Sequence, residues 1–162
     1  MLPANPQSWL DIPVLAGVSG TAFVAHAGLA ESALLKWLCE MNDTVFVART
    51  ERGTVAAQVA QVRDALSDKR ALAIFPEGTT SDGSVLLPFK SALLSALDPA
   101  PAGIAVQPVW LDYGLEGRAI AWVGDEHGVA NFLKVLARSR PFAVTVHFLA
   151  PFDPGTVGDP EC

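Results

Sequence analysis

Three short loops in this sequence carry the side chains best suited to chemistry: a carboxylate at Asp11, a guanidinium at Arg49 and a Glu-Gly corner at Glu77. Each loop lies at the end of a predicted strand or at the start of a predicted helix, where binding and catalytic residues tend to collect. The loops span residues 5–11, 49–52 and 76–81. We therefore expect the three loops to converge on one cavity that holds a single small molecule.

Each of these residues also has an ordinary structural interpretation. Asp11 could be an acid in the first turn of a helix, which the helix dipole favours. Arg49 and Arg52 could form a solvated pair, and Glu77 could be a turn residue after a strand. The Pro-Glu-Gly-Thr turn directly after an apolar run favours the functional interpretation at Glu77.

Short apolar runs alternate with helical patterns along most of the chain. The candidate strands are residues 22–25, 44–48, 71–75, 104–111, 120–123 and 143–149. The candidate helices are residues 34–41, 55–66 and 129–137, with a further helix opened by residues 5–11. Apolar strands that alternate with helices predict an α/β fold with a central, largely parallel or mixed sheet flanked by helices.

The composition bounds the class of protein. A length of 162 residues fits one domain over residues 1–162. Hydrophobic residues make up 51% of the chain and charged residues 17%, so there is ample apolar surface to bury and disorder is excluded. The net charge of −6 and a pI near 4.9 exclude a general nucleic-acid binder.

Signals for disulfides, metals and membrane spans are weak. Cys39 and Cys162 lie too far apart to build a disulfide framework or a thiolate metal site, and no group of acids and histidines has metal-ligand spacing. The longest uncharged stretch, residues 12–30, is broken by Pro13 and several glycines, and the first residues lack the features of a signal peptide. We expect no metal, no transmembrane segment and a cytoplasmic start.

The loops together resemble the motifs of the glycerolipid acyltransferase family, typified by bacterial lysophosphatidic acid acyltransferase. The first family motif, Asn-His-x-x-x-x-Asp, is matched from Asn5 to Asp11 except that Pro6 stands in place of the histidine. Further matches are residues 23–26 (FVAH), 45–49 (VFVAR), 75–81 (FPEGTTS), 87–90 (LPFK), 104–109 (IAVQPV) and 122–125 (WVGD). They occur in the family's order and cover nearly the whole chain.

The resemblance implies an activity and a role for each matched residue. Family members transfer a fatty acyl group from acyl-CoA or acyl carrier protein to a hydroxyl of lysophosphatidate, or of a similar lyso-lipid such as lyso-ornithine lipid, in phospholipid biosynthesis. The motif histidine is the general base, Asp11 would orient it, and Arg49 would bind the acceptor's phosphate. The other implied substrate-binding residues are Glu77, Gly78, Thr79 and Lys90. The resemblance implies no cofactor, because the acyl thioester is a substrate.

Pro6 replaces the one residue that would move a proton. Proline has no titratable group and no backbone N–H, and loss of a general base lowers a rate by about 10²–10⁴-fold. Three explanations stay open: a sequence error at this codon, a catalytically inactive module that binds lipid or acyl thioester, and a displaced base at His26 with Glu31. On one helix, five residues would turn His26 and Glu31 about 140° apart, which disfavours the displaced base.

The resemblance also implies partners and a location. Family members carry a strand and a helical, often membrane-embedded segment before the first motif, whereas only residues 1–4 precede it here, so we expect that strand and segment to be missing. We expect a lysophospholipid acceptor, an acyl thioester donor and no nucleic acid. We also expect peripheral contact with the cytoplasmic side of the bacterial inner membrane, through exposed apolar surface such as residues 34–38.

Overall fold

The structure is a computed structural model that describes residues 1–26, 37, 40–41, 44–47, 60, 62–66, 71–90, 94–99 and 101–156. Three residues singled out by the sequence, Glu31, Arg49 and Arg52, lie outside the described residues. So do most of the helix expected over 34–41 and the first half of the helix expected over 55–66, of which residues 62–66 are helical.

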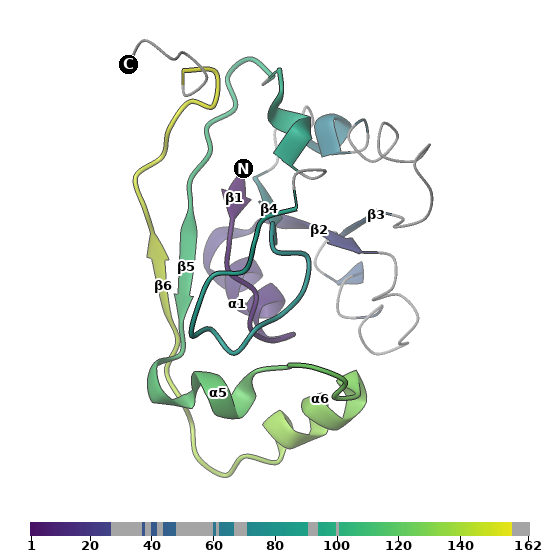
Figure 1. Ribbon diagram of the computed structural model, residues 1–162, viewed down its shortest axis with the longest axis vertical. Helices are drawn as coiled ribbons and strands as arrows, with labels where there is room; N and C mark the ends of the chain where they lie inside the picture. The colour runs from purple at the N-terminus through teal and green to yellow at the C-terminus, as the bar shows by residue number, and fades with distance from the viewer. Residues whose placement is uncertain are drawn as a thin grey trace.

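Among the described residues, four parallel strands form the central sheet (Figure 1). They are β1 (Leu2–Pro3), β2 (Ala22–His26), β3 (Val45–Val47) and β4 (Leu72–Ile74). Their order across the sheet is β1-β4-β2-β3, so both β2 and β1 lie against β4. The predicted parallel α/β sheet is confirmed, and so are the strands expected over 22–25, 44–48 and 71–75.

A short strand, β1, comes directly before the first motif. Leu2 and Pro3 pair with Ala73 and Ile74 of β4, and the Ala4 amide donates a hydrogen bond of 3.0 Å to the Ile74 carbonyl. Because Leu2 and Ala4 are almost fully buried, even this short segment gains both ladder bonds and apolar contacts. The loop that follows β1 therefore starts from a fixed position at the sheet.

A separate two-stranded sheet lies beside β1 and is linked to it by one isolated bridge. β5 (Val109–Asp112) and β6 (Thr145–Phe148) are antiparallel to each other, while Ala4 forms a parallel bridge with Val109. β5 is shorter than the run expected over 104–111 because Pro108 has no N–H for a ladder bond, and Val106 instead bridges Phe152. β6 confirms the strand expected over 143–149.

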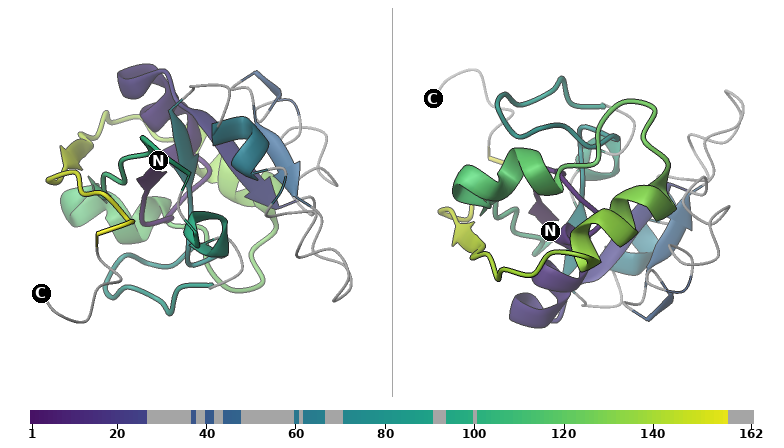
Figure 2. Two further views of the ribbon diagram at one scale, coloured as in Figure 1. Left: turned by 90° about the horizontal axis from the view of Figure 1, so that it is seen from above. Right: turned by 90° about the horizontal axis from the view of Figure 1, so that it is seen from below.

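The helices lie on both sides of this sheet and at its lower end. α1 (Asp11–Ser19) ends at Gly20, whose φ of 63° closes the last turn. Between β4 and β5 in the chain lies the short helix η2 (Ser95–Leu97). After β5 come η3 (Gly114–Glu116), α5 (Gly117–Ile120) and α6 (Gly128–Leu136). α5 and α6 pack side by side below the carboxyl ends of the parallel strands (Figures 1 and 2).

α6 confirms the helix expected over 129–137, but α5 overturns the strand expected over 120–123. Gly117–Ile120 is helical, and the Ala121 amide closes the helix by donating to the Gly117 carbonyl at 2.9 Å. Ile120 is fully buried at the end of this helix. Residues 121–123 lie in no helix or strand, so only Ile120 of the expected strand belongs to a regular element.

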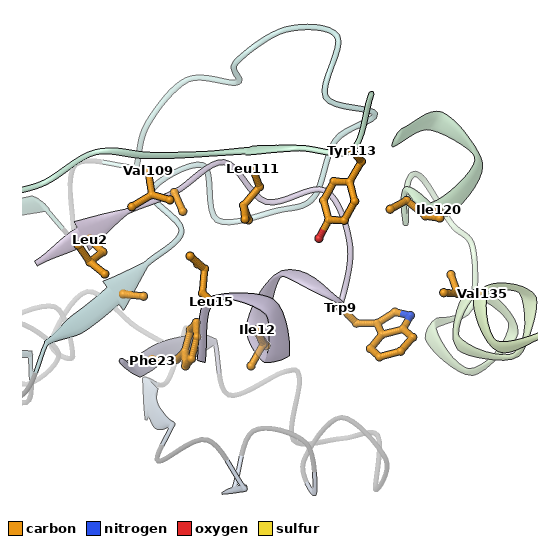
Figure 3. Close-up of a cluster of buried hydrophobic side chains, with 12 residues drawn as sticks. Leu2, Trp9, Ile12, Leu15, Phe23, Val109, Leu111, Tyr113, Ile120 and Val135 are labelled. Carbon is orange, nitrogen blue, oxygen red and sulfur yellow. The ribbon is translucent and has the colours of Figure 1, made fainter. Parts of the chain in front are cut away.

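One hydrophobic cluster ties these elements to the first loop (Figure 3). Ile12 and Leu15 of α1 pack with Phe23 of β2 and Leu111 of β5. The cluster's buried members are Leu2, Ala4, Trp9, Ile12, Leu15, Phe23, Ala73, Val109, Leu111, Tyr113, Ile120 and Val135. None of the described helices has the length and apolarity that a bilayer span requires.

Candidate functional site

Two of the three loops expected to converge do meet at the carboxyl edge of the sheet. Residues 5–11 follow β1 and residues 75–81 follow β4, and these two strands are neighbours. The Ser81 amide donates a hydrogen bond of 3.1 Å to the Pro6 carbonyl, which joins the loops directly. The third loop, with Arg49, lies outside the described residues.

Asp11 is fully buried and held by three donors. Its Oδ2 accepts hydrogen bonds from the backbone amides of Gln7 at 2.6 Å and Ser8 at 2.8 Å. Its Oδ1 accepts a hydrogen bond of 2.5 Å from the hydroxyl of Tyr113. A carboxylate offers about four acceptor positions, and donors from the described residues occupy three of them.

Burial and hydrogen bonding act in opposite directions on this carboxylate. Desolvation raises the pKa of Asp11 from 3.8 to about 6, while the bonds from Ser8, Tyr113 and Gln7 oppose the rise. Burial also raises the pKa of the Tyr113 hydroxyl, and the negative charge of Asp11 raises it further. At neutral pH Asp11 is therefore mainly ionised and Tyr113 is a neutral donor to it.

Pro6 is buried beside Asp11 and supplies no proton acceptor from its side chain. Its carbonyl is used by Ser81, and a proline has no N–H to offer. His26, the displaced base considered above, ends β2, and β4 lies between β2 and β1 in the sheet. The backbone of His26 is thus two strands away from Pro6, which argues against a displaced base.

Glu77 holds its own loop closed. It is 2% exposed, and its Oε2 accepts a hydrogen bond of 2.9 Å from the Leu87 amide. Burial raises the pKa of Glu77, and the bond from Leu87 opposes that rise. The contact shapes the segment between residues 77 and 87, which carries several of the residues described next.

Gly78 and Lys90 lie against each other, whereas Thr79 is exposed. Gly78 has a φ of 68°, and a Cβ on it would lie 3.1 Å from the Lys90 Cγ. The Lys90 amide donates to the Pro76 carbonyl at 2.7 Å, which keeps the exposed lysine next to this turn. The sequence-predicted residues Glu77, Gly78 and Lys90 therefore form one cluster.

Gln7 is a site residue that the sequence did not single out. It is 4% exposed, and its Nε2 donates a hydrogen bond of 3.0 Å to the Leu111 carbonyl. Its carboxamide lies between two glycines: a Cβ on Gly83 would come within 2.6 Å of its Cδ, and one on Gly117 within 3.2 Å of its Oε1. Gly83 also has a φ of 75°, which favours glycine.

A cavity of about 360 Å³ opens above Gln7, a size in the range of small-molecule sites. Asp11 and Glu77 are not in its lining. Because Arg49 lies outside the described residues, convergence of all three loops on one cavity stays a prediction. Tyr113 lines the cavity, and its hydroxyl donates the hydrogen bond to Asp11. The lining residues are Gln7, Asp82, Gly83, Ser84, Trp110, Asp112, Tyr113, Gly114, Leu115, Gly117 and Arg118.

Two histidines and one tryptophan lie elsewhere in the described structure. His127 and His147 are exposed. Trp9 is buried against Phe132 with ring centroids 4.6 Å apart, in keeping with a core aromatic. Within the described part of the chain, no group of three or more His, Cys, Asp or Glu side chains could hold a metal ion.

The parallel sheet and the site at its carboxyl edge define an α/β protein with the motifs of acyl transfer. A family model described as Acyltransferase matches residues 2–112. The chain therefore belongs to the glycerolipid acyltransferase family.

Two relatives show how much of a similar protein this chain covers. The chain is 36% identical to the lyso-ornithine lipid O-acyltransferase of Rhizobium meliloti (strain 1021), over 91% of this chain and 55% of the relative. It is 35% identical to the 1-acyl-sn-glycerol-3-phosphate acyltransferase of Neisseria gonorrhoeae, over 70% of this chain and 44% of the relative. The chain thus spans about half the length of these relatives.

A solved structure shares the fold over nearly all of this chain. The crystal structure of the 1-acyl-sn-glycerophosphate (LPA) acyltransferase PlsC from Thermotoga maritima matches with a TM-score of 0.62 and 25% sequence identity. The match covers 99% of this chain and 58% of that one. The likeness confirms the predicted acyltransferase-like α/β fold.

Proposed function

We propose that this protein transfers a fatty acyl group from acyl-CoA or acyl carrier protein to the hydroxyl of a lyso-lipid, and that Pro6 lowers the rate of this transfer. The observation that carries the proposal is the buried Asp11 carboxylate, fixed by three donors directly beside position 6. Relatives that act on lyso-lipids, by their names, support the substrate class.

The reaction requires that a proton leave the acceptor hydroxyl. The hydroxyl oxygen forms a bond to the thioester carbon, the carbon–sulfur bond breaks, and the thiol leaves with a proton. A hydroxyl is a poor nucleophile at neutral pH, so a base near pH 7 speeds the step by about 10²–10⁴-fold. Position 6 offers no such base in this chain. The site can then speed acyl transfer only by positioning the two substrates.

Replacement of Pro6 by histidine tests this proposal. The fourth acceptor position of Asp11 can take one N–H of the imidazole, and the other ring nitrogen is then free to accept the hydroxyl proton. We expect Pro6→His to raise the rate of acyl transfer to lyso-ornithine lipid or lysophosphatidate by about 10²–10⁴-fold over the unaltered chain. The measurement is the transfer of radiolabelled acyl groups from each donor to each lyso-lipid.

The matched control is Pro6→Ala, which removes the proline ring without adding a base. We expect Pro6→Ala to stay within a few-fold of the unaltered chain. If Pro6→His is folded and no faster than Pro6→Ala, the proposed enzyme function is wrong for this chain.

A second function is favoured by Pro6 itself. A site with a family fold and no general base would serve as a module that binds a lyso-lipid or an acyl thioester without turnover. This alternative predicts lysophosphatidate binding by the unaltered chain that Arg49→Ala removes, with no turnover in Pro6→His. Acyl transfer by Pro6→His decides in favour of the enzyme.

We also propose peripheral contact with the cytoplasmic side of the bacterial inner membrane, because both the acceptor and the product are lipids. Among the described residues, Trp37 of the segment proposed for this contact is 55% exposed, and Leu86 and Phe89 beside the site are 56% and 52% exposed. A net charge of −6 disfavours anionic bilayers, so neutral vesicles are the right probe. Failure to co-float with such vesicles that contain lyso-lipid would contradict the contact.

A further inference from the structure

A third segment contacts both loops of the site: the connection between α5 and α6, which passes below the carboxyl edge of the sheet (Figure 1). Within this connection, the Trp122 amide donates a hydrogen bond of 2.9 Å to the Gln7 carbonyl in loop 5–11. The Trp122 carbonyl accepts a hydrogen bond from the Thr80 hydroxyl in loop 75–81. The backbone of one residue therefore joins the two loops, and we call the groups of Gln7, Trp122 and Thr80 that do so the clamp.

The clamp adds a second link to the direct one between the loops. In the direct link, the Ser81 amide donates to the Pro6 carbonyl at 3.1 Å. The two links use neighbouring residues on each loop, which are Pro6 and Gln7 on one and Thr80 and Ser81 on the other. A single hydrogen bond lets two loops pivot about it, whereas a second bonded path fixes the angle between them and makes the arrangement rigid.

Trp122 is held firmly by its own segment. Its indole Nε1 donates a hydrogen bond of 2.6 Å to the Glu126 carbonyl, just before α6. On its other side, the Ala121 amide donates to the Gly117 carbonyl at 2.9 Å, and Ile120 is fully buried. Because both flanks of Trp122 are bonded and packed, the clamp joins the two loops to an ordered part of the structure.

Thr80 has no role in the motif comparison, although it lies within a matched motif. Its side chain is half-buried, and it is not among the residues that line the cavity. Its hydroxyl proton is committed to the Trp122 carbonyl. The family model ends at residue 112, so Trp122 lies beyond the matched residues.

We infer that Thr80 is a positioning residue for acyl transfer, because its bond to the Trp122 carbonyl fixes loop 75–81 relative to loop 5–11. The inference rests on the proposed function. In that function the acceptor hydroxyl must reach position 6 in one loop, while the implied substrate-binding residues Glu77 to Thr79 lie in the other. A displacement of about 1 Å between groups that must react can cost about 10²-fold in rate. The clamp holds the two loops at one relative position.

Three threonine variants test this role. Thr80→Val keeps the shape of the side chain and removes the O–H, whereas Thr80→Ser keeps the O–H. Thr156→Val is the matched control, because the Thr156 hydroxyl also donates to a backbone carbonyl, that of Asp153 at 2.8 Å, but in an exposed turn. A loss that follows from removal of any such hydrogen bond would appear in Thr156→Val as well.

Hydrogen exchange followed by NMR reads the clamp without any need for turnover. We expect Thr80→Val to quicken exchange about tenfold at the Trp122 and Ser81 amides, because the Trp122 carbonyl loses this donor and the loops can then separate. Exchange at the Ala4 amide, which is bound within the sheet, should not change, and this excludes a general loss of stability. Thr80→Ser and Thr156→Val should exchange like the unaltered chain at all three amides.

Kinetics in the Pro6→His chain test the role in the reaction. We expect Thr80→Val in that chain to lower kcat for acyl transfer about tenfold and to leave KM for the lyso-lipid within about twofold, because no side chain that binds substrate is removed. Thr80→Ser should keep kcat near that of Pro6→His alone. Thr156→Val should leave both constants unchanged.

Unchanged exchange at Trp122 in Thr80→Val would overturn the inference, and so would an unchanged kcat despite quicker exchange. A loss of kcat that Thr156→Val shares, or that Thr80→Ser also shows, would overturn it as well. If exchange quickens as expected and Pro6→His transfers no acyl group, the clamp is confirmed as the link between the loops and the proposed reaction is wrong. If Pro6→His is active and Thr80→Val changes neither exchange nor kcat, the proposed reaction stands and the positioning role is wrong.

Discussion

Asp11 shows how one residue can be both a motif position and a burden on stability. Its three donors neutralise part of the penalty of burying a charge, yet the net effect still raises its pKa to about 6. A residue chosen for stability alone would not be a buried anion here. Its burial fits a role in orienting a hydrogen-bond donor at position 6. Pro6 has no N–H to donate to this carboxylate.

The raised pKa of Asp11 predicts a specific dependence of stability on pH. Between pH 3.8 and about 6 the folded chain binds a proton that the unfolded chain has already released. The free energy of unfolding should therefore fall as pH rises through this window, by about 3 kcal/mol from Asp11, and level off above it. In Asp11→Asn this part of the fall is absent, which urea unfolding at several pH values can measure.

Glu77 provides the internal comparison for that experiment. Its pKa is raised by burial as well, so Glu77→Gln should remove a separate contribution of the same sign to the pH dependence of stability.

The result that matters for Asp11 is a change with pH. The difference in unfolding free energy between Asp11→Asn and the unaltered chain should change between pH 3.8 and about 6, whatever its value at any one pH. Parallel curves for the two proteins would show that Asp11 has an ordinary pKa.

Site residues within one contiguous motif could be predicted from the sequence. Residues whose partners lie far away along the chain could not. Asp11 and Glu77 were identified because their motifs are contiguous. Asn5, Gln7 and Tyr113 were missed because each acts across more than 100 residues of chain. No spacing rule connects the first loop to the strand that begins at Val109.

At the scale of elements, the turn at Gly83 determines where the Gln7 carboxamide can lie. Gly83 and Gly103 have nearly the same backbone, with φ of 75° and 79°, but a Cβ would meet Gln7 only at Gly83. We expect Gly103→Ala to lose about 1–2 kcal/mol of stability from the left-handed conformation alone. Gly83→Ala should lose more, because the Gln7 carboxamide must also move.

Urea unfolding of both variants separates these effects. Gly103→Ala supplies the backbone strain without the contact. If Gly83→Ala loses no more stability than Gly103→Ala does, the contact with Gln7 does not contribute to the loss.

The elements themselves were predictable wherever a run of one type was long enough. The apolar runs at β2, β3, β4 and β6 each predicted a strand, and the structure confirms all four strands. The run at 120–123 was misassigned because a short apolar run does not by itself distinguish a strand from irregular chain: Ile120 ends α5, and residues 121–123 form no helix or strand. The strand expected over 104–111 starts only after Pro108, because proline cannot donate a ladder hydrogen bond, and the pattern of apolar residues does not show this.

At the scale of the whole molecule, the first motif is also the joint between the two sheets. The Asn5 side chain donates from Nδ2 to the Leu111 carbonyl at 3.2 Å and accepts at Oδ1 from the Leu111 amide at 2.7 Å, as a strand backbone would. Ala4 and Met1 add backbone contacts to Val109 and Gln107. The loop that carries Asp11 therefore depends on β5 being in place.

Replacement of Asn5 by alanine should loosen this joint without unfolding the central sheet. The Leu111 amide loses its acceptor, at about 1–3 kcal/mol for a buried unsatisfied group, while the Leu111 carbonyl keeps its bond from Gln7. Hydrogen exchange should therefore quicken at Leu111 and remain slow at the Ala4 amide, which is bound to Ile74. Asn131→Ala, which also removes a buried asparagine but one bonded within the α5–α6 region, should leave exchange at Leu111 unchanged. Unaltered protection of Leu111 in Asn5→Ala would mean that β5 is held against β1 by its apolar contacts alone.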